Sequence, residues 1–129
     1  MGSGSGGPTA LRAGRRLSDN IESLSSKFKL NRSGYFGEPG EGRNHTRNIR
    51  SDNPARTAAE FAQMAAFHPV TTTTIAGKGV VWTMRDGSVV THRFVSSSED
   101  SSPVVELNVL GVSGVKSQKI HFVLNGKKK

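Results

Sequence analysis

A lysine and a histidine lie two positions apart near the end of the chain, in the segment QKIHFVLN. If this segment forms a β-strand, its apolar side chains point to one face, and Lys119 and His121 point to the other. An imidazole transfers protons near neutral pH, and an ammonium group stabilises the negative charge that builds up on a phosphate. The spacing therefore predicts a polar strand face with groups suited to phosphoryl chemistry.

Three preceding strands are predicted to add polar side chains to the same face. Asp86-Gly87 is a strong signal for a two-residue hairpin turn, and such a turn would place Trp82 opposite Thr91. We call the sheet face that the helices leave uncovered the free face. Alternation along the strands predicts these side chains on it: Trp82, Thr91, Arg93, Glu106, Asn108, Lys119 and His121.

These groups are sufficient to cleave RNA without a metal ion, because the ribose 2′-hydroxyl can itself be the nucleophile. We predict that His121 is the general acid or base and that Lys119 and Arg93 stabilise the phosphate in the transition state. Thr91 and Ser98 are predicted to position that phosphate.

Other residues are predicted to bind the substrate. Tryptophan can stack on an unpaired base, the serine run after Arg93 can surround a phosphate with hydroxyl groups, and the basic segment RNHTRNIRS can hold the RNA backbone. The predicted binding residues are Trp82, Ser96, Ser97, Arg47, Arg50, His45 and His92.

Simpler interpretations exist for each feature. A basic strand face is commonly only solvated, and a serine run is commonly a polar loop. A hairpin register shifted by one residue exchanges the two faces of a strand. Such a shift would expose His92, which leaves open whether it or His121 is the key histidine. The four histidines show no HxH or HxxxH spacing, so a metal site has little support.

The composition favours a polyanionic partner. The chain has 129 residues, with 18 Lys and Arg against 10 Asp and Glu, for a net charge of +8. This balance predicts nucleic acid as the partner rather than a membrane, because no segment combines a strong apolar face with basic residues. The chain has no cysteine, which excludes disulfides, thiolate metal ligands and a cysteine nucleophile.

The pattern of the chain predicts helices followed by strands. Residues 1–30 are expected to be a flexible linker with one short helix that begins near Ser18, and residues 31–129 are expected to be the functional domain. A helix is predicted after Asn53, with Pro54 at its first position, and the strands follow from Gly79 onward. The predicted fold class is α+β, with N-terminal helices packed on one face of a four-stranded antiparallel sheet.

Three segments carry a family resemblance: FGEPGEGRNHTRNIRSDNPARTAAEFAQ, GKGVVWTMRDGSVVTHRFVSSSEDSSPVVELNV and GVKSQKIHFV. Over residues 36–124 the chain resembles the C-terminal toxin domains of bacterial polymorphic toxins, including contact-dependent inhibition and LXG-type proteins. Such domains are commonly RNases, and many have the barnase–EndoU–colicin–RelE type of fold. Carried over by residue, THR corresponds to Thr91 and Arg93, SSS to Ser96–Ser98, and KIH to Lys119 and His121, while His92 departs from the pattern.

The residues and the resemblance together predict an antibacterial toxin domain. It would cleave RNA, with tRNA or another structured RNA favoured, by metal-independent 2′-OH transesterification and without a cofactor. The resemblance implies delivery from the producing bacterium, action in the target-cell cytoplasm, and a cognate immunity protein; the charge of the chain suggests that this protein is acidic. The alternatives are a metal-dependent DNase toxin and a non-catalytic basic module that binds nucleic acid.

Overall fold

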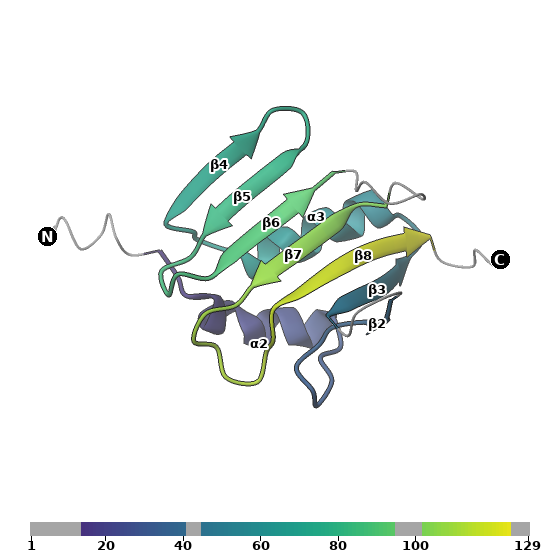
Figure 1. Ribbon diagram of the computed structural model, residues 1–129, viewed down its shortest axis with the longest axis horizontal. Helices are drawn as coiled ribbons and strands as arrows, with labels where there is room; N and C mark the ends of the chain where they lie inside the picture. The colour runs from purple at the N-terminus through teal and green to yellow at the C-terminus, as the bar shows by residue number, and fades with distance from the viewer. Residues whose placement is uncertain (1–13, 41–44, 95–101, 125–129) are drawn as a thin grey trace, which may run out of the picture.

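A single mixed sheet of seven strands forms the centre of the molecule in the computed structural model, which describes residues 14–40, 45–94 and 102–124 (Figure 1). The strand order is β2-β3-β8-β7-β6-β5-β4, and all neighbours are antiparallel except the parallel pair β3 and β8. The elements in chain order are α2 (Leu17–Lys27), β2 (Glu38–Pro39), β3 (Thr46–Ser51), α3 (Pro54–Ala65), β4 (Thr71–Ile75), β5 (Gly79–Thr83), β6 (Val89–Arg93), β7 (Val104–Asn108) and β8 (Gln118–Leu124).

The predicted four-stranded antiparallel sheet is therefore wrong. The sheet has seven strands and is mixed, and α3 lies between β3 and β4 in the chain, so the helices do not simply precede the strands. The strands β5 to β8 do form where the alternating pattern predicted strands. The additional strands β2, β3 and β4 extend the sheet at its two edges.

The missed strands β3 and β4 have little apolar alternation. In β3, TRNIRS, Ile49 is the one apolar side chain, and this strand forms along β8 by parallel pairing from Thr46 with Lys119 to Ser51 with Leu124. In β4, TTTTI, four β-branched threonines favour extended backbone and pair with β5. These two strands therefore form because of their pairing with a neighbouring strand and the β-propensity of threonine, although they lack alternating apolar residues.

The β5–β6 hairpin has a register one residue away from the predicted one. Thr83 pairs with Val89, and the Met84 N–H donates to the Ser88 carbonyl at 2.8 Å, which leaves a three-residue loop in place of the predicted two-residue turn. Gly87 has φ +90°, the conformation that the last residue of such a loop requires. Trp82 consequently pairs with Val90 and not with Thr91.

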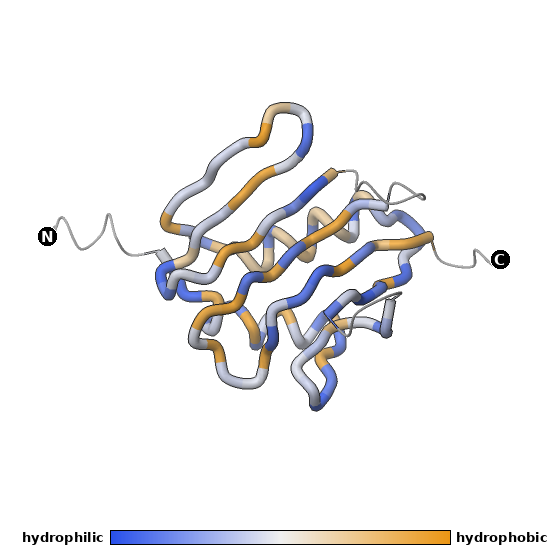
Figure 2. Tube along the Cα trace, viewed as in Figure 1, coloured by the Kyte–Doolittle hydropathy of each residue, from blue (hydrophilic) through white to orange (hydrophobic). Residues whose placement is uncertain are grey.

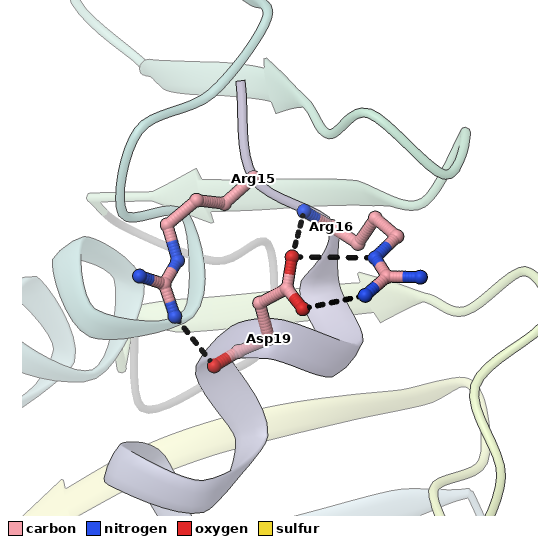
Figure 3. A network of polar contacts seen from close by, with 3 residues as sticks. All are labelled: Arg15, Arg16 and Asp19. Atoms are coloured by element: carbon pink, nitrogen blue, oxygen red, sulfur yellow. Dashed lines mark hydrogen bonds and ion pairs between the residues drawn. The ribbon is translucent and has the colours of Figure 1, made fainter. Parts of the chain in front are cut away.

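Both helices begin at identifiable capping residues. α3 begins as predicted: Asn53 Oδ1 accepts a hydrogen bond from the Arg56 N–H at 3.2 Å, and Pro54 follows it. α2 begins after Arg16 rather than at Ser18. The Asp19 carboxylate accepts hydrogen bonds from the backbone N–H of Arg16, at 3.0 Å, and from its guanidinium, and these bonds lower the pKa of Asp19 to about 2 (Figure 3).

The hydrophobic core lies between the helices and one face of the sheet, and both helices lie behind the sheet in Figure 1. Phe61 of α3 is fully buried, and its ring makes edge-to-face contacts with three other phenylalanines at centroid distances of 5.0 to 5.6 Å: Phe28, Phe36 and Phe122. Leu17 and Leu24 of α2 are also fully buried, so the hydrophobic core includes residues from before position 31. Figure 2 shows the alternation of hydrophobic and hydrophilic residues along β7 and β8 that separates this face from the free face.

Among the described residues, neither helix has the length and apolar character that would be needed to cross a membrane.

Candidate functional site

Two rows of side chains, all polar except Val104, cross the free face. Residues paired across neighbouring strands point to the same face, so the register defines each row. The first row runs Asn48, His121, Val104 and Arg93, on β3, β8, β7 and β6. The second row, one pleat away, runs Thr46, Lys119, Glu106 and Thr91 on the same strands. The structure thus brings together four of the five predicted catalytic residues: His121, Lys119, Arg93 and Thr91.

The imidazole of His121 is half-buried and is held by a serine. Ser102 Oγ lies 3.0 Å from His121 Nδ1, and Ser102 itself is only 6% exposed. A contact at Nδ1 restrains the orientation of the ring. Ser102 was missed from the sequence. The alternation of side chains could have identified it. Ser102 lies two residues before Val104, the strand partner of His121, and alternate residues of an extended chain point to the same face.

Lys119 and Glu106 lie directly opposite each other at the centre of the second row. Beside them is an open depression whose lining also includes Tyr35, His45 and Lys116. The backbone carbonyl of His45 accepts a hydrogen bond from the Lys119 N–H at 2.8 Å, so the pairing of β3 with β8 brings His45 to this end of the site. A carboxylate, two ammonium groups and an exposed imidazole therefore surround one hollow in the surface.

Arg50 lies at the outer edge of the free face. It pairs with Val123, next to the row of His121, and its Nε lies 3.4 Å from Glu38 Oε1. Both side chains are more than half exposed, so this ion pair is weak and leaves the guanidinium accessible. Asn48, which sequence reasoning missed, lies between this edge and His121.

Three of the predicted binding residues lie on the other face. Trp82 and His92 share the helix-facing side with Val90 because of the observed register, so the prediction of Trp82 on the free face is wrong. Arg47 is 6% exposed and donates hydrogen bonds to the carbonyls of Phe36, at 3.0 Å, and Gly37, at 2.9 Å. Arg47 therefore links the segment before β2 to β3. Because its guanidinium is buried and bonded to these carbonyls, it does not contact RNA.

Burial of His92 gives the protein a pH-dependent stability. The ring is 8% exposed and packs edge-to-face on Phe94 at 5.1 Å, and burial lowers its pKa below the ordinary value of 6.5. The folded state therefore binds this proton less readily than the unfolded state does. His92 permits full stability above about pH 6.5 and lowers it as the pH falls toward the folded-state pKa.

We expect His92→Gln to flatten this dependence. In urea unfolding at pH 7.5, 6.5 and 5.5, the wild type should lose stability between the last two values, and His92→Gln should lose less. His45→Gln is the matched control, because His45 is exposed and its loss should leave the pH slope unchanged. Equal slopes for the wild type and His92→Gln would mean that His92 is not the group responsible.

The predicted phosphate-positioning residues Ser96, Ser97 and Ser98 lie outside the described residues. Within the residues that are described, no three side chains of the metal-binding types His, Cys, Asp and Glu cluster together.

Comparisons with protein-family models, with curated proteins and with solved structures each give no match. The residues of the free face are therefore the basis for assigning a function.

Proposed function

We propose that this domain is a metal-independent ribonuclease that cleaves RNA by attack of the ribose 2′-hydroxyl on the adjacent phosphate. The observation that carries the proposal is the pair of rows on the free face, where His121, Glu106, Lys119 and Arg93 come from three neighbouring strands. RNA is favoured over DNA because this chemistry uses a nucleophile that only RNA has.

Glu106 and His121 are suitably spaced to carry the two proton transfers. Glu106 lies two residues from the partner of His121, and residues in this diagonal relation are about 7–8 Å apart in an antiparallel pair. Side chains that extend from these two positions would contact the same phosphate from two sides.

The Glu106 carboxylate accepts the 2′-hydroxyl proton as the 2′-oxygen forms a bond to phosphorus. The bond from phosphorus to the 5′-oxygen breaks, and that oxygen takes a proton from the His121 imidazolium. The products are a 2′,3′-cyclic phosphate and a free 5′-hydroxyl.

Lys119 and Arg93 supply the positive charge that this step needs. Lys119 faces Glu106 across β7 and β8, and Arg93 lies in the row of His121, two strands away. Two cations on either side of the acid–base pair stabilise the equatorial oxygens of the transition state. Thr91, next to Glu106, offers a hydroxyl group to the same phosphate.

The biological setting is part of the proposal. The resemblance to polymorphic toxin domains supports an antibacterial role, with delivery into a target cell and structured RNA as substrate. The charge of +8 supports an acidic immunity protein, because complementary charge accelerates association. Its binding site would include the free face, where Arg93 and Lys119 are the cations nearest to the proposed chemistry.

The chemistry is tested with a short RNA that contains one cut site. We expect cleavage in excess EDTA, a 2′,3′-cyclic phosphate on the product, and no cleavage when the nucleotide 5′ to the cut carries a 2′-deoxy sugar. Cleavage of the deoxy substrate or of plasmid DNA only in the presence of Mg²⁺ would favour the DNase alternative. Binding without cleavage would favour the non-catalytic module.

A further inference from the structure

A second depression lies at the β2–β3 edge of the sheet, beside the free face. Its lining includes Lys27 at the end of α2, Lys29 in the segment that follows, Glu38 from β2, and Asn48, Arg50 and Ser51 from β3. We call it the edge depression. Three cationic side chains and one carboxylate therefore line a hollow in which Asn48 and Ser51 provide neutral polar groups.

The cations of the edge depression remain available to a ligand. Lys27 Nζ lies 3.5 Å from Glu60 Oε1, and Arg50 Nε lies 3.4 Å from Glu38 Oε1, but all four side chains are substantially exposed. Exposed ion pairs of this kind contribute little and exchange readily for a stronger anion. Lys29 makes no ion pair with the described part of the chain.

The edge depression and the row of His121 share one residue. Asn48 lines the edge depression and is also the neighbour of His121 across β3 and β8. Neighbouring strands are about 4.8 Å apart, so the hollow begins one strand away from the proposed acid. A chain of phosphates that passes over His121 toward this edge meets Asn48 and Arg50 first and the two lysines next.

β2 pairs with β3 only as far as Asn48. Among the described residues, the rest of β3 pairs with β8 on one side and with no strand on the other. Gly37 immediately precedes β2, with φ +70° and with the Asn48 carbonyl so close that a side chain would collide with it. The short β2 strand and this glycine therefore form the wall of the hollow without filling it.

We infer that the edge depression binds a phosphate of the RNA strand beyond the cut bond, so that the preferred substrates are RNA segments of several nucleotides rather than a dinucleotide. This inference rests on the proposed ribonuclease function. A polyanionic strand matches the excess of positive charge, and an open hollow at a sheet edge suits a flexible single strand better than a rigid duplex.

The test compares two substrates that share one cut site, a dinucleotide and a 12-nucleotide RNA, with the full chain as enzyme. We expect Lys27→Gln/Lys29→Gln to lower kcat/KM for the 12-mer about tenfold, which corresponds to about 1.4 kcal/mol, because two cations near a bound phosphate are lost. The value for the dinucleotide should stay unchanged. The slope of log kcat/KM against log salt for the 12-mer should also become shallower, by about 0.7 for each phosphate that the variant no longer neutralises.

Lys78→Gln/Arg85→Gln is the matched control, because it removes the same charge from exposed positions at the two ends of β5, far from this edge. It should leave the 12-mer rate near that of the wild type. An equal loss on both substrates, no loss on the 12-mer, or the same loss in the control would overturn the inference.

A wild-type chain that cuts neither substrate would instead refute the proposed function. In that case anisotropy with a 2′-O-methyl 12-mer tests the edge depression alone: weaker binding by the double variant supports it, and unchanged binding overturns it.

Discussion

Replacing His121 by alanine should lower the rate of RNA cleavage about 10²–10⁴-fold while the domain stays folded. The large effect follows from the proposed role of the imidazole as the acid that protonates the leaving 5′-oxygen. The fold should persist because the side chain lies on the free face, outside the hydrophobic cluster. The measurement is kcat/KM on the short RNA, together with the urea unfolding midpoint.

His68→Asn is the control for this result. His68 is exposed, follows α3 and has φ +55°, a conformation that asparagine tolerates. Its replacement should leave the rate near that of the wild type. If expression of the wild-type domain stops bacterial growth, His121→Ala should restore it. A folded His121→Ala protein with nearly full activity would remove His121 from the mechanism and leave Glu106 and the exposed His45 as the groups to test.

The strands that carry the proposed chemistry were predictable because one of their faces is apolar. In β8, Ile120 and Phe122 are fully buried, while Lys119 and His121, which alternate with them, are half-buried. Burial of alternate residues leaves one possible orientation for each strand, because a shift of one residue would expose the whole apolar set. The free-face positions of Thr91, Arg93, Glu106, Lys119 and His121 could therefore be assigned from the alternation in β6, β7 and β8.

The edges of the sheet could not be predicted in the same way. β3 is recognised only through its partner β8, and a parallel pairing between residues more than 70 positions apart leaves no local signal. β4 depends on the preference of threonine for extended backbone, which is too weak a signal to separate a strand from a connector. The fold class was wrong for this reason, although the central strands had been recognised.

Trp82 shows how one loop decides the chemistry of a face. Asp86-Gly87 suits a two-residue turn, but the structure uses Arg85, Asp86 and Gly87 as a three-residue loop, with Gly87 at positive φ. The extra residue turns Trp82 toward the helix side. The free face consequently lacks its predicted stacking platform, and the proposed recognition of RNA depends on charge and hydrogen bonds.

Replacing Phe61 by alanine should lower the free energy of unfolding by about 3–5 kcal/mol, the range for removing a buried aromatic side chain from a core. Phe61 is fully buried, and its ring contacts Phe28 after α2, Phe36 before β2 and Phe122 in β8. It therefore joins both helices and the N-terminal edge of the sheet to the strand that carries His121. Because small domains are stable by only about 5–15 kcal/mol, the variant should be partly unfolded at 37 °C. Urea unfolding at 25 °C measures the loss.

Phe67→Ala is the matched control, since it removes the same ring from a position just after α3 that is 52% exposed. The free energy of unfolding of Phe67→Ala should fall by no more than about 0.5 kcal/mol, as for surface substitutions in general, with a small addition from the contact of Phe67 with Arg15.

A measurement of activity shows whether the substitution Phe61→Ala affects stability alone. The folded fraction of this variant at 10 °C should cleave RNA at the wild-type rate, because Phe61 lies on the opposite side of β8 from His121. A loss below about 1 kcal/mol, or a folded but inactive protein, would contradict the separation of the core from the free face on which the assignment of the site depends.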